Sequence, residues 1–212
     1  MFASPLANVV ALSASATIEL TMDWLTVVFN TTREGSDPAV VQGQLRQALE
    51  AALAEARRSA RPGDVLVRTG GFALQPRYGQ KGVVTGWQGH AELVIEGRDT
   101  AAIAQMLGRI QTLTVGRVAW SLSREARERV ESEVAAQAIA RFRTRADEVA
   151  RQFGMSGYAL REVSVGGNEQ GGAPPVVMMR AQAARAAADE SLPVEAGKAQ
   201  VTSTVSGTIQ LK

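Results

Sequence analysis

Cysteine is absent from this chain of 212 residues, and histidine occurs once, as His90. Without cysteine the chain forms no disulfide scaffold, no thiolate zinc site, no iron–sulfur cluster and no thiol nucleophile. A single imidazole excludes a site built from several histidines and leaves any serine–histidine mechanism dependent on His90 alone. The usual catalytic side-chain sets are therefore missing, and we expect neither a bound metal nor a cofactor.

Lysine is also scarce, because only three of the 23 basic residues are lysine and the rest are arginine. The arginines are scattered among 21 acidic residues, so the formal net charge is only +2. A surface that binds nucleic acid shows a basic stripe or patch, which this distribution does not supply. We therefore expect no nucleic-acid partner.

Long apolar runs are missing too, since none approaches the roughly 20 residues that a transmembrane helix requires. Residues 1–16 are mildly apolar and rich in alanine and serine, but they lack the positively charged start of a secretory signal. The chain is then either cytosolic or the mature part of an exported protein. We expect residues 1–15 to form a flexible N-terminal segment.

Alternating apolar residues predict a strand over residues 17–32, in which the apolar positions change parity near Trp24. Such a change indicates a β-bulge or a strand that twists between two packing surfaces. Asp37 followed by Pro38 is typical of a helix start, and apolar residues at helical spacing continue to Ala56.

Two further strands are predicted around a turn at residues 79–82. The first of them holds Gly70-Gly71, which indicates a bulge or a bend, and Pro76, which cannot donate a ladder hydrogen bond and so favours a sheet edge. Asp99 predicts the cap of a second, short helix, and a fourth strand follows at residues 113–122.

These elements occur in the order β-α-β-β-α-β over residues 16–122, the ferredoxin-like order, which makes an antiparallel sheet with both helices on one face. Ser123 predicts the cap of a long helix at 124–153, followed by a strand from Tyr158 and a last strand ending at Leu211. We therefore predict an α+β protein in which residues 123–212 extend the first unit, with a loop at 166–197, packed together as one domain.

The candidate sites are few. His90 is expected to be a solvent-facing or edge histidine, because no second imidazole or thiolate can join it. The acids of the long helix each have an arginine within one turn, which is typical of a solvated helix face rather than a metal cage. An interface or small-ligand surface is predicted at one hairpin, formed by Pro76, Tyr78 and Trp87.

Four stretches, taken in order, resemble the SIMPL-domain family. They are Asp37-Pro38 with its helix, the run from Gln75 to Tyr78 followed by Gly86-Trp87, the alanine-rich long helix ending at Gly154 and followed by Tyr158-Ala159-Leu160, and Pro193 to Gly197 before the last strand. The similarity covers residues 16–212. The chain departs from the family pattern at Met22-Asp23-Trp24, where a glycine is often expected, and at Trp87, where tyrosine is common.

The resemblance implies an exported protein of the periplasm or the extracellular space, homo-oligomeric assembly in some members, and a link to oxidative-stress tolerance. It implies no catalytic residues. We accordingly expect a non-enzymatic, self-assembling protein with a role in envelope or stress physiology, with no integral membrane segment but with association to the envelope. The alternative is a small-molecule-binding module near Tyr78 and Trp87, and an unrecognised hydrolase is the third reading.

Overall fold

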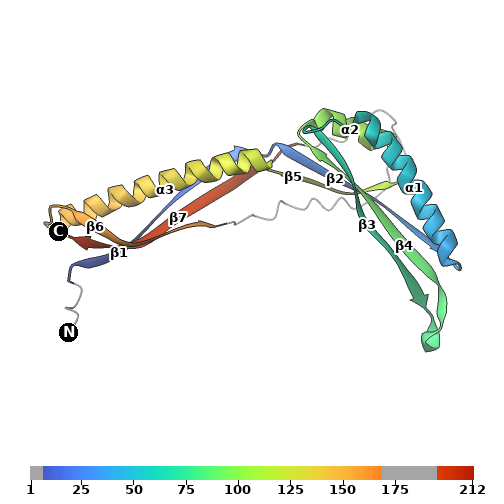
Figure 1. Cartoon of the computed structure of the whole chain (residues 1–212), viewed down its shortest axis with the longest axis horizontal. Helices are drawn as coiled ribbons and strands as arrows, with labels where there is room; N and C mark the ends of the chain where they lie inside the picture. The colour runs from blue at the N-terminus through green and yellow to red at the C-terminus, as the bar shows by residue number, and fades with distance from the viewer. Residues whose placement is uncertain (1–6, 169–194) are drawn as a thin grey trace. The chain divides into compact units, whose positions relative to one another are not determined.

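The computed structural model describes residues 7–168 and 195–212, and the chain divides into two compact units. Of the described residues, unit 1 takes 7–22, 122–168 and 197–212, and unit 2 takes 23–121 together with 195–196. Each unit has its own sheet and its own helical layer (Figure 1).

Unit 2 is built from β2 (Trp24–Gly35), α1 (Pro38–Ser59), β3 (Val65–Tyr78), β4 (Val84–Gly97), α2 (Thr100–Arg109) and β5 (Thr114–Ser121). A short 3-10 helix, η1 (Gln80–Gly82), connects β3 to β4. The strands form one antiparallel sheet in the order β3-β4-β2-β5. This is the predicted ferredoxin-like arrangement, in which β4 lies between β2 and β3.

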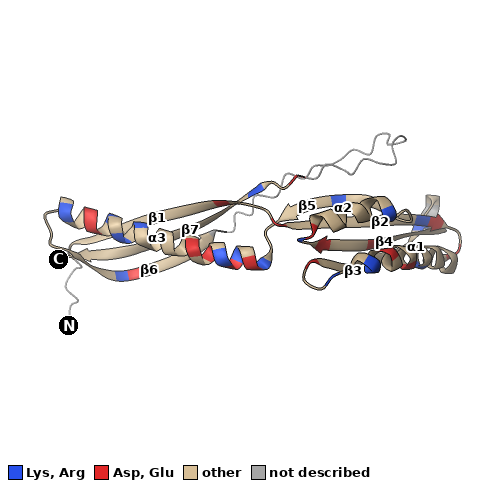
Figure 2. Ribbon diagram, turned by 90° about the horizontal axis from the view of Figure 1, so that it is seen from above, with Lys and Arg blue, Asp and Glu red and all other residues tan. Residues whose placement is uncertain are grey.

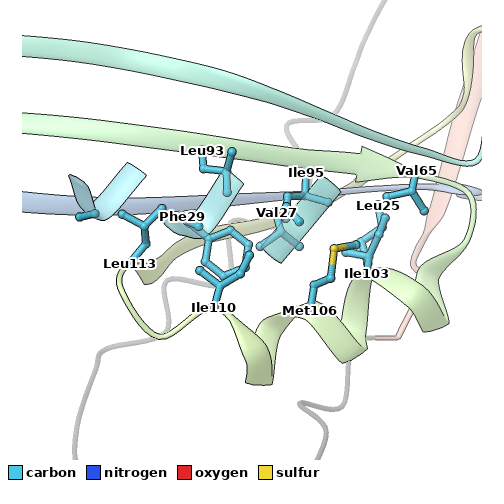
Figure 3. Close-up of a cluster of buried hydrophobic side chains, with 13 residues drawn as sticks. Leu25, Val27, Phe29, Val65, Leu93, Ile95, Ile103, Met106, Ile110 and Leu113 are labelled. Atoms are coloured by element: carbon cyan, nitrogen blue, oxygen red, sulfur yellow. The ribbon is translucent and has the colours of Figure 1, made fainter. Parts of the chain in front are cut away.

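The helices of unit 2 begin where the sequence predicts. Asp37 accepts a hydrogen bond from the backbone N–H of Ala39 at 2.8 Å, and Asp99 accepts one from Ala102 at 2.9 Å. Both helices cover one face of the sheet and share a core with β2 and β4, shown in Figure 3. The largest fully buried members of this core are Leu25, Val27, Phe29, Val65, Leu93, Ile95, Ile103 and Met106.

Unit 1 packs one long helix on a three-stranded sheet. Its elements are β1 (Val9–Thr21), α3 (Arg124–Gln152), β6 (Tyr158–Asn168) and β7 (Lys198–Leu211), with the antiparallel strand order β1-β7-β6. Ser123 caps α3 as predicted, accepting a hydrogen bond from Ala126 N–H at 3.2 Å, and Gly154 follows its end at φ 71°. Figure 2 shows acidic and basic residues interspersed along α3, as a solvated face requires.

Three predictions about boundaries are wrong. Residues 9–15 are not part of a flexible segment, because they pair with β7 along the first half of β1. The parity change near Trp24 is not a bulge within one strand: β1 and β2 belong to different sheets, and the chain passes from one to the other there. The expected division at residues 16–122 and 123–212 also differs from the observed units, since β1 joins the C-terminal part of the chain.

Helix α3 buries an apolar stripe from Val130 to Ala146, but the last residue of the helix predicted at 124–153 is not buried. Phe153 is 65% exposed, because it lies at the C-cap with non-helical backbone angles, and Ala150 takes the last buried position. Of the predicted loop at 166–197, residues up to Asn168 continue β6, and residues 169–194 lie outside the described part of the chain.

Candidate functional site

The hairpin of β3 and β4 carries the three residues predicted to form a surface site. Pro76 and Trp87 are cross-strand partners, and β3 is a sheet edge, as the proline predicts. Trp87 is half-buried against Val41, Leu45, Leu74 and Ala91, so its ring serves mainly to pack α1 on the sheet. Tyr78, by contrast, is 64% exposed.

The hairpin therefore divides into a packed part and an exposed part. Val83 and Val84, beside η1, are also exposed, at 63% and 46%. Two hollows in the described part of the chain lie elsewhere, one along the C-terminal half of α3 and one between α1 and Gln111-Thr112. The geometry thus brings Pro76 and Trp87 together but places Tyr78 on an open surface rather than in a shared pocket.

His90 lies on the sheet face opposite the helices, in the inner strand β4. Its Nε2 is 3.1 Å from Oε1 of Glu92, whose other carboxylate oxygen accepts a hydrogen bond from the backbone N–H of Gly71 at 3.0 Å. The hydrogen bond with His90, then that from Gly71, hold the pKa of the Glu92 carboxyl below its usual value.

The bulge of β3 makes room for this carboxylate. Gly70 and Gly71 together oppose the single residue Glu92, which is the two-against-one count of a β-bulge. A side chain at Gly70 would collide with the Glu92 side chain, since its Cβ would lie 2.8 Å from the Glu92 Cβ. The His90–Glu92–Gly71 set therefore fixes the bulge, and among the described residues no group of three or more metal-ligating side chains is found.

Strand edges are the second kind of candidate site, because an unpaired edge offers backbone donors and acceptors to another strand. The two described sheets have four edge strands, β1, β3, β5 and β6. Three of them carry features that discourage pairing. The features of β3 are Pro76, the two-glycine bulge and the charged residues Arg68 and Arg77. Strand β5 has only eight residues, and it carries a register shift and Arg117.

Edge strand β1 is engaged by α3. Arg141 donates a hydrogen bond to the carbonyl oxygen of Ser15 at 2.9 Å, and Arg145 donates one to that of Ser13 at 3.4 Å. Near its end, Glu19 forms an ion pair with Lys198 at 2.7 Å. Carbonyl groups that already accept from guanidinium groups are poorer templates for a new strand.

Edge strand β6 lacks such protection over most of its length. Its only charged residues, Arg161 and Glu162, lie together at a register shift near its start, and residues 163–167 carry no charge (Figure 2). Leu160, Val163 and Val165 are 55%, 41% and 50% exposed. Sequence reasoning predicted this strand but did not identify its exposed apolar side chains.

The three exposed side chains of β6 share one face of the sheet. Leu160 lies opposite Ile209 and Val165 opposite Val205, both of which are buried beneath α3, and Val163 lies opposite Gly207. The helix itself continues this apolar surface through Ile139, which is 41% exposed. Ile139 and Arg141 are two residues apart on α3, so their side chains are separated by about 200° around the helix axis. Because Arg141 bonds to β1, Ile139 lies on the opposite flank of the helix, toward β6. We call Leu160, Val163, Val165 and Ile139 the β6 surface.

None of the helices in residues 7–168 and 195–212 is long and apolar enough to cross a membrane.

Comparison with solved structures finds partial likenesses. The crystal structure of AtUAH in complex with glyoxylate is 16% identical over 62% of this chain and 34% of that chain, with a TM-score of 0.28. The same figures hold for AtUAH in complex with (S)-hydroxyglycine. The present chain spans about a third of the length of that protein, and a likeness at this TM-score carries no argument about function.

Comparison with curated proteins finds no match. The profile of one protein family does match, and it extends over residues 10–209, from the start of β1 almost to the end of β7. The match thus includes both units and the edge strand β6. That family is SIMPL, described as a protein of unknown function (DUF541), and the chain belongs to it.

Proposed function

We propose that this chain is a non-enzymatic, exported protein that assembles with itself and serves envelope or oxidative-stress physiology. The observation that carries the proposal is the β6 surface on an edge strand that bears no charge over residues 163–167. Edge strands of soluble proteins are usually blocked by charge, proline or a bulge, and an unblocked apolar edge favours pairing with another strand.

The proposed lack of enzymatic activity rests on the chemistry of the side chains. The single imidazole is paired with Glu92 on an open sheet face, where it positions the β3 bulge. The proposed export and physiological role rest on the resemblance to SIMPL proteins alone. Self-assembly is the part of the proposal that the geometry supports, and it is therefore the part to test first.

The first experiment is light scattering coupled to size-exclusion chromatography on the full chain, at several protein and salt concentrations. We expect a particle of fixed stoichiometry, larger than the 22.5 kDa chain, whose size changes little with salt because apolar contact and backbone pairing dominate. A protein that stays strictly monomeric at high concentration contradicts the proposal.

A substitution within the β6 surface shows whether this surface is responsible. Val163→Lys places a charge on the unprotected edge and is expected to weaken self-association at least about tenfold, the equivalent of roughly 1.4 kcal/mol. Val40→Lys is the matched control, because Val40 is an exposed valine (54%) on α1 of unit 2. Equal effects of the two variants would show that assembly does not use β6.

A further inference from the structure

The uncharged stretch of β6 has a sequence that suits pairing with itself. We propose that β6 pairs antiparallel with β6 of a second copy about a two-fold axis through Ser164, joining two three-stranded sheets into one continuous six-stranded sheet. The inference rests on the self-assembly proposed above and names its surface and register. The occupant is a second copy because each residue then meets a chemically suitable partner from the same stretch.

The proposed register is defined by which residues lie opposite each other. With Ser164 opposite Ser164 of the second copy, Val163 lies opposite Val165 and Val165 opposite Val163, which gives two apolar pairs on the face that α3 covers. Cross-strand pairs of β-branched residues are favourable in antiparallel sheets. Glu162 then lies opposite Gly166, so no like charges meet.

The neighbouring registers are less suitable. A two-fold axis perpendicular to the sheet keeps each side chain on its own face of the sheet. Such an axis passes through one residue of β6, which then lies opposite the same residue of the second copy. An axis through Glu162 sets two carboxylates against each other, which is destabilising. An axis through Val163 sets Val165 against Arg161, and an axis through Val165 sets Val163 against Gly167. Only the axis through Ser164 yields two valine pairs.

The same axis continues the apolar surface across the two copies. Because the axis keeps faces unchanged, α3 of each copy lies on the same side of the joined sheet, and the four valines lie between the two helices. Leu160 and Ile139 of each copy border this strip, so the whole β6 surface contributes. The other edge of each sheet, β1, stays engaged by Arg141 and Arg145, which limits the pairing to two copies at this surface.

The absence of cysteine permits a direct test, because a single introduced thiol is the only one in the chain. In the full-length Ser164→Cys variant, the two copies of residue 164 face each other. Directly opposed residues in an antiparallel pair have Cα atoms about 4.5–5.5 Å apart, within the roughly 4.4–6.8 Å that a disulfide spans. Under diamide, which takes up the two electrons and two protons of the thiols, we expect a reducible dimer on a non-reducing gel.

The matched control is Ser13→Cys, an exposed serine on edge strand β1 of the same sheet. We expect Ser164→Cys to cross-link at least about tenfold faster than Ser13→Cys. Introducing Val163→Lys into Ser164→Cys should abolish this difference, with unchanged far-UV circular dichroism showing that the fold is retained.

The outcomes separate this inference from the proposed function. If light scattering shows a stable oligomer but Ser164→Cys cross-links no faster than Ser13→Cys, the β6 register is wrong and self-assembly stands. If the unmodified chain is monomeric and the thiol of Ser164→Cys does not react with a maleimide, β6 is covered by another part of the same chain. That result overturns both the β6 pairing and the proposed self-assembly.

Discussion

At the scale of single residues, Glu92 links a local hydrogen-bond set to the pH dependence of stability. Its pKa is lowered by His90 and Gly71, so the folded state favours the carboxylate. The stability that the ionised Glu92 carboxylate contributes to the folded state is present above the usual pKa near 4.5, and it is lost as pH falls through the lowered pKa. We expect Glu92→Gln to reduce the free energy of unfolding by up to about 1 kcal/mol at about pH 7, because the site is partly exposed.

The loss in Glu92→Gln should shrink at an acidic pH below the lowered pKa, where the native carboxyl is itself protonated. Urea unfolding at the two pH values measures the difference. Glu131→Gln on α3 serves as the control for removal of one exposed carboxylate. A loss that is the same at both pH values would show that the charge of Glu92 does not stabilise the bulge.

Gly97 illustrates a steric requirement at the end of β4. A Cβ at this position would overlap the carbonyl oxygen of Asp64, which accepts hydrogen bonds from the backbone N–H groups of Arg98 at 2.9 Å and Asp99 at 3.2 Å. Because backbone rather than a flexible side chain is in the way, we expect Gly97→Ala to destabilise the protein by about 2–4 kcal/mol. Thermal or urea unfolding provides the measurement.

The matched glycine is Gly43, within α1, where an added Cβ meets nothing within 4 Å. Gly43→Ala should instead stabilise the protein by about 0.5–1 kcal/mol, because alanine costs less conformational entropy in a helix. If both variants change stability in the same direction and by similar amounts, the steric argument for Gly97 fails.

At the scale of elements, local signals predicted most of the fold. Asp37, Asp99 and Ser123 each mark a helix start through a side-chain oxygen that accepts from the first turn, and the structure confirms all three. The β-α-β-β-α-β order follows from these caps and from the alternation of apolar residues between them. Such signals lie within a few residues of the feature that they determine, so one sequence is enough to read them.

Features that depend on distant partners could not be predicted. Residues 9–15 form a strand because they pair with residues 204–210, and the break between β1 and β2 exists because these strands join different sheets. The β6 surface has the same cause: alternation predicted the strand, but the exposure of Val163 and Val165 depends on α3 packing over β1 and β7. Likewise, the sequence predicted a surface position for Trp87, because the packing of α1 against its ring depends on tertiary contacts.

At the scale of the whole molecule, the two units differ in how the chain builds them. Unit 1 needs both ends of the chain, since its central strand β7 pairs with β1 from the far N-terminal side and with β6. Within the described residues, the helices and strands of unit 2 come from one continuous segment, Asp23–Ser121, which also holds its buried core and its helix caps. Closing contacts over a short segment costs less chain entropy than closing them over nearly the whole chain.

The continuity of unit 2 leads to a prediction about autonomy. A fragment of residues 23–121 should fold by itself, with mixed helix and strand signals in far-UV circular dichroism and one cooperative urea transition, because the core from Leu25 to Leu113 is complete. A fragment of residues 23–112, which lacks β5, should be much less stable, because it loses Val118 and Trp120 from that core and leaves β2 unpaired on one side. An unfolded longer fragment would mean that unit 2 depends on contacts outside this segment, and the units would then be one cooperative structure.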